Sequence, residues 1–196
     1  MSARANVTLV LGGARSGKSR YAEALFARHP DARLYVATGQ AGDAEMAERI
    51  RRHRAQRGES WRTIEAPLDL VSALEAQGRP GAAILVDCLT LWLSNLMGAG
   101  RDVERARDGL VAWLRNSPCP IVLVSNEVGF GIVPDNEIAR RFRDHAGRLN
   151  QEVASVADAV VLVAAGLPLA LKGDAALAVS DRNALAGLRA ISERRA

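Results

Sequence analysis

The sequence predicts an α/β fold with a mostly parallel central sheet that is flanked by helices on both faces. Short apolar runs alternate along the chain with longer segments of helical periodicity. The short runs are dense in Val, Ile and Leu instead of alternating with polar residues, which is typical of strands covered on both faces. Such alternation of strands and helices indicates parallel strands joined by crossover helices. With 196 residues, of which 48% are hydrophobic, the chain can bury a sizeable core.

The elements expected along the chain follow from these patterns. Strands are predicted at residues 7–11, 34–38, 61–64, 82–86, 121–125 and 159–164. Helices are predicted at residues 19–28, 43–56, 68–77, 89–97 and 102–115, and a last one runs from Pro134 and Asp135 to about Ala157, with Asp135 as a candidate cap. We expect residues 1–172 to form one domain and residues 173–196 to form a C-terminal tail, helical or loosely attached.

Composition narrows the range of partners and locations. The net charge of +4 and the pI of about 9.7 suit nucleic acid or small acidic substrates such as nucleotides. No apolar run approaches the roughly 18 residues of a membrane span, and no secretory signal fits the N-terminal residues. Cys88 and Cys119 adjoin apolar runs and are expected to be reduced, buried thiols. A cytoplasmic location is therefore predicted.

A glycine-rich loop follows the first predicted strand and opens the first predicted helix. Its residues fit G-x-x-x-x-G-K-[ST]: Gly12, Gly13, Ala14, Arg15, Ser16, Gly17, Lys18 and Ser19. Glycines let successive N–H groups point at one phosphate, and the helix N-terminus adds further donors. Only Lys18 and Lys172 are lysines in this arginine-rich chain, so one of its two lysines stands at the motif position that contacts phosphates, where we expect it to be exposed. The context disfavours a glycine-rich turn without a ligand.

The loop predicts a P-loop NTPase fold of the RecA-like type and phosphate transfer from a nucleoside triphosphate. Lys18 would reach the outer phosphates, and the Ser19 hydroxyl would bind Mg²⁺. Asp87 ends an apolar strand, where a parallel sheet gathers its ligand-binding residues, and is the candidate acid for the magnesium shell. The alternative is that Asp87 caps the helix predicted at residues 89–97.

A strongly basic segment, residues 49–57, contains one histidine, His53. Taken alone, it favours a solvated basic helix with His53 beside Ile50. In the sharper hypothesis, the arginines bind phosphates and a neutral His53 imidazole attacks one. His29 and His145 are expected at the surface.

A second motif occupies residues 122–151. It reads VLVSNEVGFGIVP and then DNEIARRFRDHAGRLNQ. This segment predicts a strand, a glycine-containing loop and a polar helix. Asn126 and Glu127 lie at the end of the strand, near the expected crevice.

Together with GGARSGKS, the ATGQ of residues 37–40 and the R-I-x-x-H of Arg49 to His53, this motif resembles the bifunctional adenosylcobinamide kinase / adenosylcobinamide-phosphate guanylyltransferase family. The resemblance runs from about Thr8 to Lys172. It implies that ATP or GTP phosphorylates the hydroxyl of adenosylcobinamide. It also implies that GTP then gives GMP to a histidine and on to adenosylcobinamide phosphate, forming adenosylcobinamide-GDP. A homotrimer and Mg²⁺ are implied as well.

The resemblance also implies the site residues. His53 would be the nucleophile and Lys18 the second catalytic residue. Besides the phosphate loop, the nucleotide-binding positions are Ala37, Thr38, Gly39, Arg54, Ala55, Gln56, Arg57, Glu65 and Asp87. This chain departs from the family in having Arg52 where a first histidine is common, and Asp87 where Glu is usual.

Two other functions stay open at this point. One is a nucleic-acid-associated P-loop ATPase, although aromatic residues make up only 4% of the chain and offer few platforms for bases. The other is a simple small-molecule kinase in which His53 is structural.

Overall fold

The computed structural model of the chain describes residues 6–26, 29, 32–39 and 61–173. Its elements are β1 (Val7–Gly12), α1 (Lys18–Leu25), β2 (Ala32–Ala37), β3 (Trp61–Glu65), α3 (Leu70–Gln77), β4 (Ala82–Asp87), α4 (Leu89–Gly98), α5 (Val103–Arg115), β5 (Ile121–Asn126), α6 (Glu137–Val156), β6 (Ala159–Ala164) and β7 (Leu167–Lys172). Every strand predicted from the sequence is present, and five of the predicted helices are present with shifted ends. The helix predicted at residues 43–56 lies outside the described residues.

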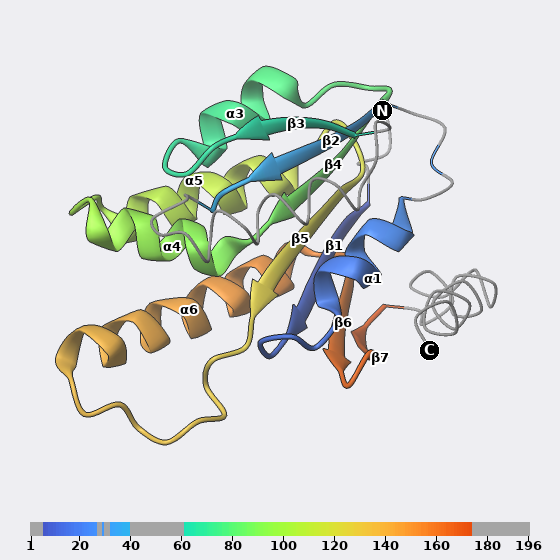
Figure 1. Cartoon of the computed structure of the whole chain (residues 1–196). Coiled ribbons are helices and arrows are strands. Elements are labelled where there is room, and N and C mark those ends of the chain that lie inside the picture. The colour runs from blue at the N-terminus through green and yellow to red at the C-terminus, as the bar shows by residue number, and fades with distance from the viewer. Residues whose placement is uncertain (1–5, 27–28, 30–31, 40–60, 174–196) are drawn as a thin grey trace.

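The strands form one sheet in the order β3-β2-β4-β5-β1-β6-β7 (Figure 1). All neighbouring pairs are parallel except β6 and β7. The carboxyl ends of six strands therefore meet at one edge of the sheet, where α/β proteins place their ligands. The predicted α/β class, with its mostly parallel sheet, is confirmed.

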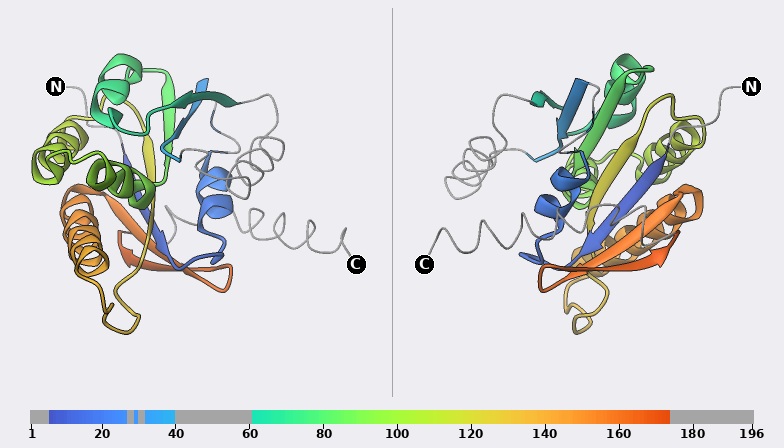
Figure 2. Two further views of the ribbon diagram at one scale, coloured as in Figure 1. Left: turned by 60° about the vertical axis from the view of Figure 1, so that its left-hand side comes forward. Right: turned by 90° about the vertical axis from the view of Figure 1, so that its right-hand side faces the viewer.

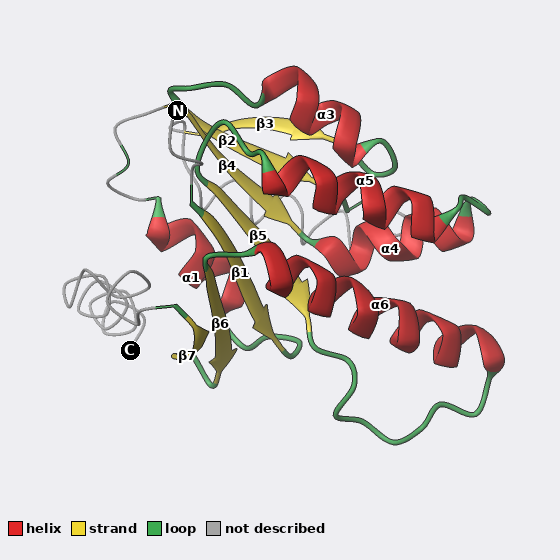
Figure 3. Ribbon diagram, turned by 180° about the vertical axis from the view of Figure 1, so that it is seen from behind, coloured by secondary structure: helices red, strands yellow, loops and turns green. Residues whose placement is uncertain are grey.

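Among the described residues, helices cover the two faces of the sheet unequally. The helices α3, α4, α5 and α6 lie on one face (Figure 3), and α1 lies on the other (Figures 1 and 2). Successive residues of β1 pack to opposite sides, since Leu9 joins the core under the four helices and Val10 joins the core under α1. Burial on both faces explains why the strand sequences are continuously apolar.

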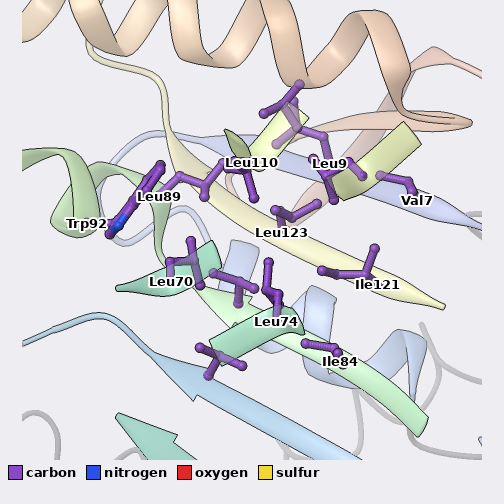
Figure 4. Close-up of a cluster of buried hydrophobic side chains, with 14 of the residues drawn as sticks. Val7, Leu9, Leu70, Leu74, Ile84, Leu89, Trp92, Leu110, Ile121 and Leu123 are labelled. Carbon is purple, nitrogen blue, oxygen red and sulfur yellow. The ribbon is translucent and has the colours of Figure 1, made fainter. Parts of the chain in front are cut away.

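The larger core lies between the sheet and the four helices (Figure 4). Trp92 of α4 is its largest fully buried side chain, at 1% exposure, and its indole N–H donates to the Leu68 carbonyl at 2.8 Å. Each leucine buried here contributes about 1.5–3 kcal/mol relative to an exposed one. No helix among the described residues is long and apolar enough to cross a bilayer.

Strand β7 was not predicted from the sequence. It pairs antiparallel with β6 across a two-residue turn in which Ala165 and Gly166 both have positive φ, 51° and 78°. This is the geometry of a tight hairpin turn, but the sequence lacks the Asn-Gly or Asp-Gly pair that announces one. Pro168 also argues against a strand, and it is accommodated because β7 is at the edge of the sheet.

Two expectations about α6 are wrong. The helix is capped by Asn136, whose Oδ1 accepts from the Ala139 N–H at 2.7 Å, and not by Asp135. Asn136 is the residue with extended backbone directly before the helix, and Asp135 is one position too early. His145 was expected at the surface but is half-buried, because the core helix face includes its neighbour Ala146.

Candidate functional site

The carboxyl edge of the sheet brings most of the predicted site residues into one row. Ala37 of β2 lies opposite both Glu65 of β3 and Asp87 of β4. Gly12 of β1 lies opposite Asn126 of β5. Since β5 separates β4 from β1, the row runs from Glu65 through Asp87 and Asn126 to the phosphate loop, residues 12–19. Sequence segments far apart along the chain are thus combined at one edge.

The phosphate loop has the backbone shape that its glycines and its helix require. Gly17 is the N-cap of α1 with φ of 95°, a left-handed conformation that glycine adopts without strain. Arg15 also has a positive φ of 57°. The Ser16 N–H donates to the Gly13 carbonyl at 3.2 Å, which turns the chain back on itself. Residues 13–15 stay exposed at the helix N-terminus, where backbone donors attract anions.

The tip of the β6–β7 hairpin supports this loop from behind. The Gly166 N–H donates to the Ser16 carbonyl at 2.9 Å. A Cβ at Gly12 would lie 2.5 Å from the Val163 carbonyl oxygen, and one at Gly17 would lie 3.4 Å from the Gly166 Cα. Gly12 is therefore required by the space between β1 and β6. The end of β6 and the turn that follows it therefore hold the predicted loop in place.

Lys18 is buried, with only 7% of its surface exposed, whereas an exposed lysine was expected. Its Nζ donates to the Gly13 carbonyl at 3.0 Å, so the ammonium group is held inside the loop it belongs to. Ser19 follows on the first turn of α1 and is half-buried. A buried ammonium at a helix N-terminus is a strong local attraction for anions.

Asp87 is half-buried at the end of β4, and its Oδ2 accepts from the Tyr35 hydroxyl at 2.9 Å. Within the described residues, its other carboxylate oxygen accepts no hydrogen bond. The N-cap of α4 is Cys88, with no side-chain capping bond. The alternative of a capping Asp87 is therefore wrong.

Asp87 and Ser19 supply oxygen ligands of the kind that Mg²⁺ prefers. Among the described residues, no three His, Cys, Asp or Glu side chains are grouped to hold a metal on their own. This donor set fits a magnesium ion that takes its other ligands from nucleotide phosphates and water.

Thr38 directly follows β2 and is hydrogen-bonded to Cys88, which directly follows the neighbouring strand β4. The side chain is fully buried, its hydroxyl donates to the Cys88 carbonyl at 2.7 Å, and its Oγ1 accepts from the Cys88 N–H at 2.8 Å. The Thr38 carbonyl accepts from the Asn95 side chain at 2.7 Å. Its hydroxyl is thus used within the protein, while Gly39, the next residue, is half-buried and packs near Leu91.

Cys88 and Cys119 are both buried and unbridged, as predicted. Burial raises the pKa of the Cys88 thiol, and the Asp87 carboxylate raises this pKa further. The Thr90 hydroxyl and the Lys18 charge lower the same pKa without reversing the shift. Cys88 is therefore a neutral thiol that lies within the electrostatic reach of both Asp87 and Lys18.

The structure adds one pair of residues that the sequence did not connect. Asn126, at the end of β5, is hydrogen-bonded to Thr90 of α4 through its backbone N–H at 3.0 Å and its Nδ2 at 2.7 Å. The sequence placed Asn126 near the crevice. Thr90 lies within an apolar helical stretch and gave no signal of its own.

The predicted nucleophile is not part of the described structure. His53 and the neighbouring nucleotide-binding candidates Arg54, Ala55, Gln56 and Arg57 lie outside the described residues, as does Arg52. Their roles stay predictions.

The sheet order, with β5 inserted between β1 and β4, and the loop between β1 and α1 define a P-loop NTPase of the RecA-like type. A solved ATPase from the type III secretion system of pathogenic bacteria has the same fold. The TM-score is 0.54 at 13% identity, over 92% of this chain and 60% of that one.

A family model described as cobinamide kinase / cobinamide phosphate guanyltransferase matches residues 8–171, and the chain belongs to this family. The chain is 49% identical to the bifunctional adenosylcobalamin biosynthesis protein CobP of Pseudomonas aeruginosa, over 85% of this chain and 97% of that protein. It is 46% identical to the bifunctional protein CobU of Salmonella typhimurium, over 84% of this chain and 98% of that protein. The resemblance found in the sequence is confirmed, and the nucleic-acid-associated ATPase is not favoured.

Proposed function

We propose that this chain catalyses two successive reactions on one corrinoid substrate. In the first, ATP or GTP phosphorylates the hydroxyl group of adenosylcobinamide. In the second, GMP passes from GTP to adenosylcobinamide phosphate, and adenosylcobinamide-GDP results. The observation that carries the proposal is the family match over residues 8–171, which includes the phosphate loop at the end of β1.

The geometry of the phosphate loop supports the kinase reaction. Exposed backbone at residues 13–15 and the N-terminus of α1 would bind the triphosphate, and the Lys18 ammonium would neutralise charge on its outer phosphates. Mg²⁺ held by Ser19 and Asp87 would add further positive charge. Because phosphoryl transfer passes through a loose transition state, positioning and charge neutralisation supply most of the catalysis. Glu65, Ala37 and Gly39 would line the nucleotide from the neighbouring strand ends, and Thr38, which is fully buried, would hold this edge together through its hydrogen bonds to Cys88.

The second reaction requires a nucleophile that the phosphate loop does not provide. The proposal assigns this role to His53, supported by the family resemblance. An imidazole nitrogen of His53 would form a bond to the α-phosphorus of GTP, and the bond from that phosphorus to the pyrophosphate oxygen would break. The phosphate oxygen of adenosylcobinamide phosphate would then attack the same phosphorus and release the imidazole. Arg54 and Arg57 would stabilise the charge on the phosphates.

Incubation of the protein with α-labelled GTP tests this route directly. We expect covalent label that is lost in acid and survives in base, as a phosphorus–nitrogen bond on imidazole would. His53→Ala should abolish the label and guanylyl transfer while largely sparing phosphorylation of adenosylcobinamide. His29→Ala is the matched control, which should keep the label. Labelling should also fall as the pH drops below about 6.5, where a free imidazole becomes protonated.

Two results would contradict the assignment. Wild-type labelling of the His53→Ala protein would exclude His53 as the nucleophile. Equal loss of both reactions in a folded His53→Ala protein would make His53 a residue that positions the nucleotide.

The proposal extends to the organisation of the chain. Residues 1–172 would form the catalytic domain and residues 173–196 a tail outside it, and three copies would assemble into a homotrimer in the cytoplasm. Light scattering of the full chain would test the trimer, and the same measurement on a chain ending at residue 172 would test whether the tail is needed for it. The tail assignment requires that the shorter chain keep both reactions.

A further inference from the structure

Nearly every polar atom of Asn126 is held in place by the protein. Its backbone N–H and its Nδ2 both donate to the Thr90 hydroxyl oxygen, at 3.0 and 2.7 Å. Its backbone carbonyl accepts from the Asn150 Nδ2 at 3.3 Å. Of the polar atoms of Asn126, only the side-chain oxygen Oδ1 has no hydrogen-bond partner among the described residues. Asn126 is half-buried, so the protein does not cover this residue completely.

Thr90 fixes which end of the Asn126 amide faces outward. Its side chain lies 3.3 Å from the Cys88 sulfur, and both residues are buried, at 4% and 5% exposure. The Thr90 hydroxyl can donate to that sulfur, and the Asn126 Nδ2 lies 3.9 Å from the same sulfur. The two lone pairs of the hydroxyl are then left to accept from Asn126. With the amide nitrogen directed at Thr90 and Cys88, the amide oxygen faces away from both.

The position of Asn126 places this residue at the carboxyl edge of the sheet, beside the phosphate loop. Asn126 pairs with Gly12, the first residue of the phosphate loop, and the next residue, Glu127, donates its N–H to the Gly12 carbonyl at 3.1 Å. On its other side, β5 pairs with β4 through Val124 and Asp87. Asn126 thus lies two positions further out than the residue opposite Asp87. It stands between the phosphate loop and the candidate magnesium ligand.

The chemistry of a carbonyl oxygen decides what this atom can contact. It accepts hydrogen bonds and cannot donate them, so it repels the unprotonated oxygens of a triphosphate. It is complementary to a hydroxyl group. The hydroxyl that must approach the γ-phosphate in this crevice is that of the phosphate acceptor. This identification rests on the proposed kinase reaction.

We propose that Asn126 Oδ1 accepts a hydrogen bond from the alcohol of the phosphate acceptor and aims its oxygen at the γ-phosphorus, with Thr90 as the residue that positions Asn126. The alcohol oxygen forms the new bond to phosphorus as the bond to the β-phosphate oxygen breaks. The nucleoside diphosphate leaves with that electron pair. The hydroxyl proton passes to solvent, and Asn126 takes no proton because an amide oxygen is a very weak base.

The two reactions of the enzyme should depend on Asn126 to different degrees. In the kinase reaction the acceptor is an alcohol with a hydrogen to donate. In guanylyl transfer the acceptor is a phosphate group, which at neutral pH is mostly the dianion and has no such hydrogen. Loss of Oδ1 should therefore lower the ratio of phosphorylation to guanylyl transfer, whereas general damage to the site would lower both reactions together.

The test measures both reactions on the same preparations of the full-length protein, the second with preformed adenosylcobinamide phosphate. For Asn126→Ala we expect the ratio of phosphorylation to guanylyl transfer to fall about 10- to 100-fold, as loss of one positioning hydrogen bond would produce. The fall should lie mainly in kcat and in the KM for the acceptor, and not in the KM for the nucleotide. Thr90→Val should lower the ratio in the same direction, and Thr90→Ser, which keeps the hydroxyl, should restore it.

Several results would overturn the proposal. An unchanged ratio in Asn126→Ala would do so, as would equal failure of Thr90→Ser and Thr90→Val. A higher magnesium requirement as the main defect would make Oδ1 a metal ligand instead. If Asn126→Ala does not fold, the two Thr90 variants decide the matter. A wild-type protein without either reaction would remove the proposed function and this inference together. An active wild-type protein with an unchanged variant ratio would remove the inference alone.

Discussion

The phosphate loop and the β5–α6 segment, residues 127–136, leave neighbouring strands at the same edge of the sheet, yet they differ in how the rest of the protein packs against them. In the phosphate loop residues 13–15 are exposed, whereas Lys18 is buried at 7% exposure. In the β5–α6 segment the large apolar residues Phe130, Ile132 and Val133 are 87%, 97% and 60% exposed. Figure 1 shows this segment extending away from the rest of the molecule beyond the end of β5.

The difference indicates that the phosphate loop is preformed, whereas the β5–α6 segment has a surface that the described part of the chain leaves uncovered. The phosphate loop is braced by the β6–β7 hairpin, so its shape exists before any nucleotide binds. The β5–α6 segment forgoes about 1.5–3 kcal/mol of burial for each large apolar side chain left in water. Exposed apolar groups gathered on one segment indicate a surface that a partner or substrate covers. We therefore expect the phosphate loop to control catalysis and the β5–α6 segment to control acceptor binding, with little effect on stability.

The largest expected effect is that of Lys18→Ala. Phosphorylation of adenosylcobinamide should fall by about 10³-fold or more, because the ammonium charge on the outer phosphates is lost. Lys172→Ala removes the other lysine of the chain, which is exposed and donates to the Ala154 carbonyl, and serves as the control. Because Lys18 is buried, the variant should also lose some stability, and its unfolding in urea must be compared with wild type. A folded Lys18→Ala protein with near-wild-type turnover would disprove the role of the loop.

Asp87→Asn should change the magnesium dependence of both reactions. An amide can still accept the Tyr35 hydrogen bond but binds Mg²⁺ more weakly than a carboxylate, so we expect the half-saturating Mg²⁺ concentration to rise by about tenfold or more. Titration of each reaction with Mg²⁺ measures this. Asp69→Asn, at an exposed position beside Arg101, is the control. An identical magnesium curve for Asp87→Asn would leave that residue without a metal-binding role.

Gly12→Ala tests how tightly the loop is held. The added Cβ would lie 2.5 Å from the Val163 carbonyl oxygen, which is backbone and cannot rotate away. The free energy of unfolding should fall by about 1–3 kcal/mol, as measured by urea denaturation. Gly131→Ala is the matched change in the β5–α6 segment, where the added Cβ meets nothing within 4 Å, and it should cost little. Equal stabilities would show that the hairpin does not brace the loop.

The smallest effect on stability is expected for Phe130→Ser combined with Ile132→Ser. Both side chains are in solvent, so the free energy of unfolding should change by less than about 0.5 kcal/mol. If the segment binds the acceptor, the KM for adenosylcobinamide should rise severalfold while the KM for the nucleotide stays constant. By contrast, Leu123→Ala in the core should cost about 2–5 kcal/mol. A large loss of stability in the double variant would mean that the segment is covered in solution, for instance by a second copy of the chain.

Local patterns were enough to predict six of the seven strands, most of the helices, the phosphate loop and the family. Each of these depends on residues that are close in sequence: an apolar run covered on both faces, or glycines and a lysine at set spacing between a strand and a helix. The same local reasoning placed Asp87 at a strand end, but it could not decide between a metal ligand and a helix cap. The fold excludes the helix cap, because it gives the cap position to Cys88, and it brings Tyr35, 52 positions away, to the Asp87 carboxylate.

The burial of Lys18, the hairpin behind the phosphate loop and the pairing of Asn126 with Thr90 came from the tertiary structure alone. Thr90 and Asn126 are 36 positions apart, and they meet because α4 follows β4 while β5 lies next to β4 in the sheet. Such contacts depend on strand order and register, which no short window of sequence contains. The motif supplied the chemical groups of the site, and the order of the strands decided which of those groups face one another.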